Sequence, residues 1–201
     1  MPCTNRCAGP TCVRALEVEL SRWLDHECET GPGYEPQWLE WKFTEEAPLR
    51  LDGILVTGAV DRIDVGPAGA IVRDYKASKG FPQATWAAEG HLQAALYALA
   101  ARDLLGLDVA GALYQPLRKD DLRPRGAVRS GDAAVGVLAN DVLDPGAWEA
   151  LLSELRTEAE DAAARLRAGD IVPCPERCTP RGCAYPGICR ARDAAPPPPS
   201  P

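Results

Sequence analysis

The sequence predicts a mixed α/β domain in which helices flank a central sheet. Apolar residues near the start recur with a helical period, short apolar segments separated by turn residues follow, and two longer helical segments lie further along the chain. An order of helix, several strands, helix, strand and helix is typical of a domain whose helices cover a sheet. The length of 201 residues suits one such domain with short appendages.

The first expected helix covers residues 13–28. It carries apolar residues at a helical spacing, namely Val13, Leu16, Leu20, Trp23 and Leu24. Residues 1–12 are rich in Cys and Pro and are interpreted as an irregular N-terminal arm. The domain core is therefore expected over residues 13–170.

Strands are expected next, over residues 37–43, over residues 49–65 with an internal break, and over residues 70–75. The segment Gly66-Pro-Ala-Gly69 is expected to join the last two as a hairpin. Residues 83–105 then read as helical, with an interruption near Gly90. Gly106 stands at a position typical of a helix C-terminus.

The second half begins with an expected strand over residues 109–117, followed by a polar loop over 119–133 and a short strand over 135–138. The clearest helix opens at Asp144-Pro145, because Asp suits the N-cap and Pro the first helical position. Gly169 is expected to end this helix. Its predicted apolar stripe consists of Trp148, Leu151, Leu152, Leu155, Ala159, Ala162 and Leu166.

Composition limits the class of protein. Hydrophobic residues make up 46% of the chain, charged residues 25%, and the net charge is −7. No apolar run approaches the ~18 residues of a membrane span, and the first residues lack a secretory h-region, so a cytoplasmic protein without a membrane partner is expected. The acidic charge is unusual for a nucleic-acid binder. Only 4 lysines occur, which draws attention to Lys76 and Lys79.

Charged residues follow two neighbouring predicted strands. The first carries Gly58-Ala-Val-Asp61-Arg-Ile-Asp64, and the second ends in Arg73-Asp74-Tyr75-Lys76. Asp74 and Lys76 are two residues apart and should share one face of the sheet, with Asp61 on the adjacent strand. Two carboxylates suit Mg²⁺ or Mn²⁺, and a nearby lysine can orient an attacking water. The alternative is a solvated hairpin with ordinary surface ion pairs.

These motifs resemble those of PD-(D/E)XK nucleases of the RecB/AddB group, in which G-x-x-D-R-x-D, D-Y-K and Q-x-x-x-Y follow in this order. The resemblance implies a restriction-endonuclease-like core in which Asp61 and Asp74 bind the metal and Lys76 is the catalytic lysine. Tyr75, between them, belongs to the implied metal site.

The same resemblance assigns further residues. Gln93 and Tyr97, four residues apart on one helix, would contact DNA or support the site. Glu40 matches an upstream acidic residue of the catalytic and metal site, with Glu45 and Glu46 as rival candidates. Asp64 is expected to share the face of Asp61 and to pair with Arg62 or Arg73.

The cysteines form two groups, Cys3, Cys7 and Cys12 near the start and Cys174, Cys178, Cys183 and Cys189 near the end, with Cys28 alone. Residues 171–190 resemble the C-terminal cysteine segment of the AddB-like group. The resemblance implies a [4Fe–4S] cluster bound by Cys178, Cys183 and Cys189, with Cys174 as an extra candidate and Cys28 or another upstream cysteine as the fourth ligand. Four thiolates equally suit Zn²⁺, so a zinc site of Cys174, Cys178, Cys183 and Cys189 stays open. Residues 191–201 read as a disordered Pro-rich tail.

The function expected from these motifs is metal-dependent hydrolysis of DNA, most simply by an exonuclease of DNA repair or recombination. The alternative is a non-catalytic nuclease-like module that binds DNA ends or a helicase partner. The chain has no G-x-x-x-x-G-K-[ST] loop, so any helicase activity would belong to a partner subunit or to the remainder of a larger helicase–nuclease. A bare zinc or disulfide scaffold would require the D-Y-K motif to be coincidental.

Overall fold

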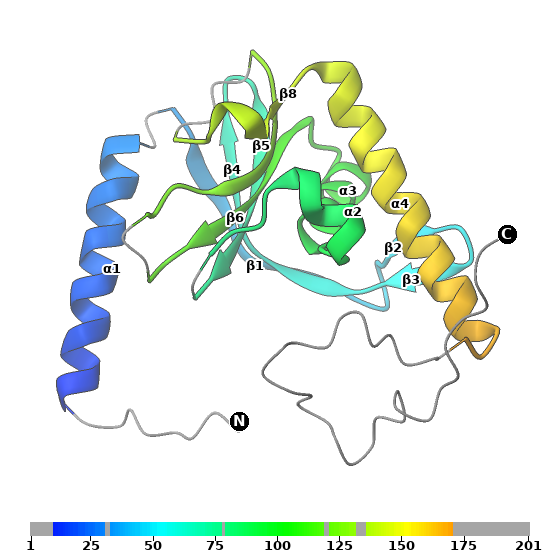
Figure 1. Ribbon diagram of the computed structural model, residues 1–201, viewed down its shortest axis with the longest axis horizontal. Coiled ribbons are helices and arrows are strands. Elements are labelled where there is room, and N and C mark those ends of the chain that lie inside the picture. Colours follow the sequence, from blue (N-terminus) through cyan, green and yellow to red (C-terminus); the bar gives the residue numbers. More distant parts are fainter. Residues whose placement is uncertain (1–9, 31–32, 78, 119–120, 132–135, 171–201) are drawn as a thin grey trace, which may run out of the picture.

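The computed structural model describes residues 10–30, 33–77, 79–118, 121–131 and 136–170. Within these ranges a six-stranded sheet has the order β1-β4-β5-β6-β7-β8, and β2 and β3 form a separate hairpin. Figure 1 shows α1 on one side of the sheet and α2, α3 and α4 on the other. The predicted mixed α/β architecture, with a central sheet between helices, is confirmed.

The elements have the following bounds: α1 Pro10–Thr30, β1 Glu35–Phe43, β2 Leu49–Leu51, β3 Ile54–Val56, β4 Gly58–Gly66, β5 Gly69–Lys76, the 3₁₀ helix η1 Gln83–Thr85, α2 Trp86–Glu89, α3 Gln93–Leu105, β6 Val109–Pro116, β7 Arg125–Arg129, the 3₁₀ helix η2 Ala139–Asp141, β8 Val142–Leu143 and α4 Pro145–Arg167. The expected interruption of the helical region falls at Gly90, whose φ is 70°. Gly106, with φ 67°, ends α3 as predicted.

The first helix is longer than predicted and less covered. It begins at Pro10, so residues 10–12 are helical rather than part of an irregular arm. Trp23 is buried at 9% exposure. The other apolar residues of the predicted face, Val13, Leu16, Leu20 and Leu24, are exposed. The spacing therefore predicted the helix correctly, but among the described residues of this face only Trp23 is buried.

The strands that carry the charged motifs form the predicted hairpin. β4 and β5 pair antiparallel, with Gly66 opposite Gly69 at the turn. Gly69 has φ 126°, and a Cβ there would lie 2.5 Å from the carbonyl oxygen of Asp108, so this turn needs glycine. β5 then pairs parallel with β6, and α2 and α3 make the crossover connection that parallel pairing requires.

Two predictions in the second half of the sheet are wrong. Residues 125–129, expected within a polar loop, form strand β7 antiparallel to β6. Residues 136–138 are not a strand, and the short strand β8 lies further on, at Val142–Leu143. Gly126 explains the first error. A Cβ there would lie 2.2 Å from the carbonyl oxygen of Ala112, so the close packing of β7 on β6 requires glycine. In the sequence, a glycine at this point indicates a loop rather than a strand.

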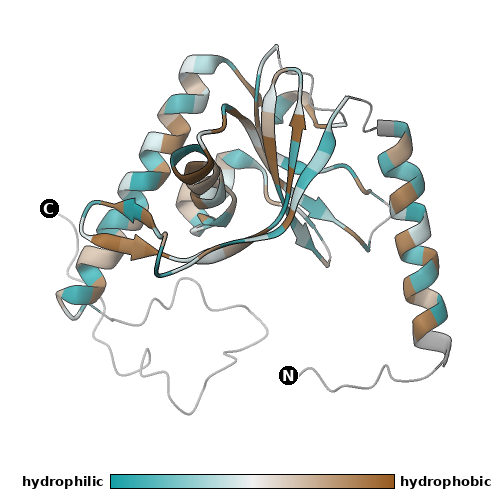
Figure 2. Ribbon diagram, turned by 180° about the vertical axis from the view of Figure 1, so that it is seen from behind, coloured by the Kyte–Doolittle hydropathy of each residue, from teal (hydrophilic) through white to brown (hydrophobic). Residues whose placement is uncertain are grey.

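The main core lies between the sheet and α3, with α4 packed outside. The buried face of α3 consists of small residues and one leucine: Ala94, Ala95, Ala98, Leu99, Ala100 and Ala101. Figure 2 shows this hydrophobic helix against the sheet. On α4, Asp144 caps the first turn by accepting from the N–H of Ala147 at 2.9 Å, as predicted. The predicted stripe of α4 is buried from Trp148 to Ala159, but Leu166 is 64% exposed.

Among the helices of the described ranges, none combines the length and the apolar character needed to cross a bilayer.

Candidate active site

Three acidic residues of the predicted site occupy one row across neighbouring strands. Leu39 pairs with Arg62 and Trp41 with Val60, so Glu40 on β1 lies opposite Asp61 on β4. Arg62 pairs with Arg73 at the end of the β4–β5 ladder, so Asp61 and Asp74 are the next residues beyond this last pair. The sheet register therefore brings Glu40, Asp61 and Asp74 to adjacent positions.

The carboxylate of Asp61 lies where β4 and β5 separate. The paired residues of these strands end at Arg62 and Arg73, and beyond them Oδ2 of Asp61 accepts a 2.7 Å hydrogen bond from the N–H of Tyr75. The side chain thus satisfies a main-chain donor that the strand ladder no longer reaches. This bond fixes Asp61 beside the end of β5 and leaves its second carboxylate oxygen available.

Asp74 is a buried carboxylate at 3% exposure. Its Oδ2 forms an ion pair with Nζ of Lys76 and accepts no well-directed hydrogen bond from the described residues. Burial raises the pKa of Asp74 above its ordinary value, the ammonium of Lys76 lowers it, and the negative charge of Asp61 raises it again. A buried carboxylate oxygen is stabilised by a neighbouring positive charge, so Asp74 is suited to bind a cation.

Lys76 connects Asp74 to helix α3. Its Nζ donates a 2.9 Å hydrogen bond to Oε1 of Gln93, and Nε2 of Gln93 donates a 2.8 Å bond to the hydroxyl of Tyr97. Gln93 and Tyr97 therefore lie at the carboxylate–lysine group, and the exposed Gln93 bonds to Lys76 through its oxygen and to Tyr97 through its nitrogen. The motif residues of β4, β5 and α3 form one connected set.

Tyr114 on β6 is a member of the site that the motifs did not indicate. It pairs with Asp74 in the sheet register, and its ring centroid lies 5.2 Å from Nζ of Lys76. Its hydroxyl accepts from the N–H of Ala94 and donates to the carbonyl of His91, each at 3.2 Å. Burial raises the pKa of Tyr114 to about 12. A tyrosine in an apolar strand was the available signal, since a buried hydroxyl needs a partner.

Glu40 is exposed and has φ 52°, the one positive φ among described non-glycine residues. Burial raises the pKa of Tyr97, and the charges of Asp74, Asp61 and Glu40 raise it further, so all three carboxylates lie in its vicinity. Among the residues described, however, no three or more His, Cys, Asp or Glu side chains are grouped to hold a metal. Glu40 is thus near the pair of aspartates without completing a three-ligand group.

Two residues of the motifs face the α1 side of the sheet. The ring of Tyr75 packs edge-on against Trp23, with centroids 5.5 Å apart, so only its main chain is available to the site. Asp64 is fully buried and accepts from Arg62 and, at 2.7 Å, from Nε of Arg73. The expected pairing is confirmed, but the expectation that Asp64 shares the face of Asp61 is wrong.

The physical reason is the separation of three residues between Asp61 and Asp64, which places them on opposite faces of a strand. The Asp64 network continues through Arg73 to Oε1 of Gln115 at 3.0 Å and through Arg62 to Glu27 of α1 at 2.7 Å. These contacts satisfy buried charges and join α1 to the sheet.

The cysteine predictions are only partly within the described residues. Cys28 lies on α1 as an exposed free thiol. Cys174, Cys178, Cys183 and Cys189 lie outside the described residues, as do Cys3 and Cys7. Cys12 lies in the first turns of α1.

The fold and the site together define a class: an α/β domain with two adjacent aspartates and a lysine at the end of a central β-hairpin. The family model for the PD-(D/E)XK nuclease superfamily matches residues 11–190. The chain therefore belongs to the PD-(D/E)XK nuclease superfamily. A comparison with curated proteins found no match.

Proposed function

We propose that this chain is a Mg²⁺- or Mn²⁺-dependent nuclease that hydrolyses phosphodiester bonds of DNA at Asp61, Asp74 and Lys76. The observation that carries the proposal is the juxtaposition of these three residues. Asp74 is buried and ion-paired with Lys76, and Asp61, the next residue beyond the last β4–β5 pair, lies near enough for its charge to raise the pKa of Asp74. Family membership supports the metal-dependent chemistry.

The residues present fit such a cation. Oδ2 of Asp74 is a buried oxygen without a well-directed hydrogen bond, and Asp61 has one oxygen not held by Tyr75. Mg²⁺ is commonly bound by only one or two carboxylates, together with waters and substrate phosphates, so a third carboxylate is not required. Asp61 and Asp74 would hold the cation, with the carbonyl of Tyr75 and Glu40 as additional candidates.

When bound, the cation supplies a Lewis acid and lowers the pKa of a water molecule. The residues of the protein itself position the reacting groups. Lys76 is fixed between Asp74 and Gln93, so its ammonium can orient the attacking water and offset the negative charge that develops on the phosphate. Gln93 and Tyr97 restrict the rotation of Lys76, because they form a hydrogen-bonded chain from α3.

We expect the chain to act as an exonuclease in DNA repair or recombination. The test is digestion of end-labelled linear DNA and of closed circular DNA by the full chain with Mg²⁺ or Mn²⁺. Loss of the linear substrate alone supports an exonuclease. Cutting of circles would show an endonuclease, and binding of DNA ends or of a helicase without any cleavage would favour the non-catalytic alternative.

For the cysteine segment we propose a [4Fe–4S] cluster bound by Cys178, Cys183 and Cys189, with Cys174 and Cys28 as further candidates and Zn²⁺ as the alternative. The proposal rests on the sequence pattern alone. Metal analysis of anaerobically purified protein tests it. Iron with a broad visible absorption that Cys189→Ser abolishes supports the cluster, whereas stoichiometric zinc without colour supports the alternative.

A further inference from the structure

A basic pocket adjoins the candidate active site at the same edge of the sheet. It has a volume of about 330 Å³ and is lined by Lys79, Gly80, Pro82, Pro116, Asp121, Arg123 and Arg125. Pro116 is the direct β6 partner of Lys76 on β5, so the pocket begins one strand away from the catalytic lysine. These lining residues come from the segment after β5, the end of β6 and the segment that enters β7.

The sheet register fixes the distance of the pocket from the aspartates. Arg125 pairs with Tyr114, and Tyr114 pairs with Asp74. Adjacent strands lie about 4.8 Å apart, so Arg125 lies roughly 10 Å from Asp74 along the row. Successive phosphates of one strand are farther apart than the ~3.4 Å rise along a duplex axis, so this span covers at most about three nucleotides.

The charged groups of the pocket retain capacity for a ligand. Arg125 uses Nε and Nη2 to hold the buried Asp141 at 2.6 and 3.3 Å, which leaves Nη1. Arg123 uses Nε and Nη2 on Asp121, each at 2.8 Å, and likewise leaves Nη1. The two Asp neutralise the two Arg, but the fork geometry of the remaining N–H groups suits phosphate oxygens.

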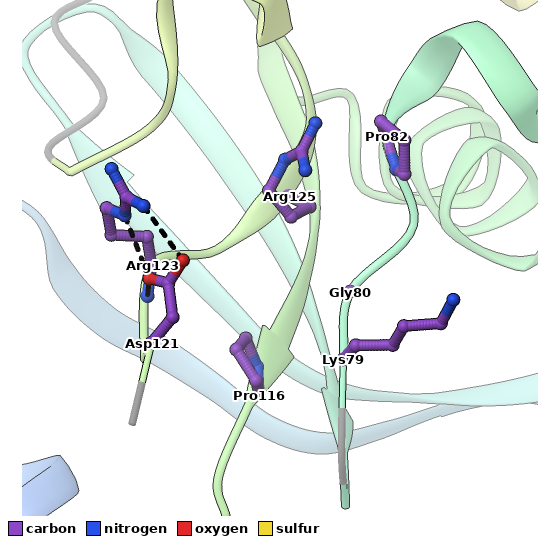
Figure 3. Close-up of a pocket in the computed structure, with 7 residues that line it drawn as sticks. All are labelled: Lys79, Gly80, Pro82, Pro116, Asp121, Arg123 and Arg125. Carbon is purple, nitrogen blue, oxygen red and sulfur yellow. Dashed lines mark hydrogen bonds and ion pairs between the residues drawn. The ribbon is translucent and has the colours of Figure 1, made fainter. Parts of the chain in front are cut away.

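Lys79 supplies the excess positive charge. It is exposed, and within the described ranges it makes no hydrogen bond or ion pair. Figure 3 shows Lys79 on one side of the pocket, directed away from Arg125 and Arg123, which lie on the other side. The neighbouring Gly80 fixes this segment, because a Cβ there would lie 2.7 Å from the carbonyl oxygen of Tyr114 and 2.9 Å from Cβ of Arg125. The cations therefore lie on either side of the pocket, and the segment of Lys79 packs closely against β6 and β7 at Gly80.

The geometry points to a second phosphate-binding site: Lys79 on one side of the pocket and Arg123 and Arg125 on the other bind backbone phosphates of the nucleic-acid strand, within about three nucleotides of the bond held at Asp61 and Asp74. The inference rests on the proposed nuclease function and adds where the substrate strand runs. In a chain of net charge −7, such local cations are needed to attract a polyanion.

The test uses the full chain and single-stranded oligonucleotides that carry one uncharged methylphosphonate linkage at successive positions. Wild type should lose affinity at the positions whose phosphates lie in the pocket, within about three nucleotides of the cut. Lys79→Ala should weaken binding of the all-phosphate oligonucleotide about two- to fivefold, the effect of one exposed charge contact, and should then be insensitive to a neutral linkage at one of these positions. Arg123→Gln should behave in the same way.

Arg165→Ala is the matched control, because it removes one positive charge from the exposed last turn of α4, away from the pocket. Binding measured in Ca²⁺ gives a readout that needs no cleavage. Lys79→Ala should lower the slope of log affinity against log salt by about 0.7, whereas the control should leave it unchanged.

The outcomes separate the two proposals. If Lys79→Ala binds like Arg165→Ala, or stays as sensitive to the neutral linkage as wild type, the phosphate site is wrong even if the protein cleaves DNA. If wild type cleaves no nucleic acid, but Lys79→Ala binds it more weakly and with less salt dependence than wild type and Arg165→Ala do, the phosphate site stands and the nuclease proposal fails.

Discussion

Nζ of Lys76 on β5 donates a 2.9 Å hydrogen bond to Oε1 of Gln93 at the start of α3. The bond joins the strand that carries Asp74 to the helix that covers it. It favours a positioning role for Gln93 over DNA contact, because its amide oxygen and one amide N–H are already bonded to Lys76 and Tyr97.

Gln93→Ala should therefore lower kcat by about tenfold with little change in KM, since it removes an interaction that orients the lysine. Tyr97→Phe, which keeps the ring and removes one acceptor of Gln93, should have a smaller effect. Steady-state kinetics on one labelled oligonucleotide measures both. A rise in KM at constant kcat would instead assign Gln93 to DNA contact.

Replacement of Lys76 should abolish cleavage. Lys76→Met keeps an aliphatic side chain over Tyr114 and removes the charge, so kcat should fall by about 10²- to 10⁴-fold. Circular dichroism should remain that of wild type, because Lys76 is partly exposed. Cleavage by Lys76→Met at the parent rate would show that this lysine has no catalytic role.

Tyr114→Phe tests the support beneath the site. The variant keeps the ring near Lys76 but loses the two 3.2 Å hydrogen bonds to Ala94 and His91. The buried N–H of Ala94 loses its side-chain acceptor, so the free energy of unfolding should fall by about 1–3 kcal/mol. Denaturant titration measures this change, and an unchanged midpoint would show that these bonds do not stabilise α3.

Asp74→Asn should be at least as stable as wild type in EDTA at neutral pH. The folded-state pKa of Asp74 is raised above 3.8, so its stabilising contribution is complete below that value and is lost as pH rises through the folded pKa. The melting temperature of Asp74→Asn relative to wild type should therefore increase from about pH 4 to about pH 7. Asp121→Asn is the contrasting control, because Arg123 lowers the pKa of Asp121 to about 2. A relative stability of Asp74→Asn that falls with pH would contradict the assignment.

Much of this arrangement could be predicted from local patterns. The spacing of Asp74 and Lys76 predicted their shared face, and the turn Gly66–Gly69 predicted the hairpin that brings Asp61 beside the end of β5. The positive φ of Glu40 could not be predicted, because no local pattern marks it.

Strand β7 was not predicted because it contains Gly126, a residue type that is common in loops. Glycine is needed at this position because β7 lies in close contact with β6. Tyr114 and Arg125 reach the site only through pairing between strands distant in sequence. Long-range strand pairing, which a single sequence does not display, accounts for these omissions.

Mn²⁺ binding by Asp74→Asn compared with wild type tests most directly whether the aspartate pair is a metal centre. Free Mn²⁺ is counted by electron paramagnetic resonance during titration of the full chain at neutral pH, with Arg165→Ala as control. Wild type and the control should bind one more Mn²⁺ than Asp74→Asn, and Asp61→Asn should show the same loss. Equal numbers of sites with equal affinity in wild type and both aspartate variants would contradict a metal centre at Asp61 and Asp74.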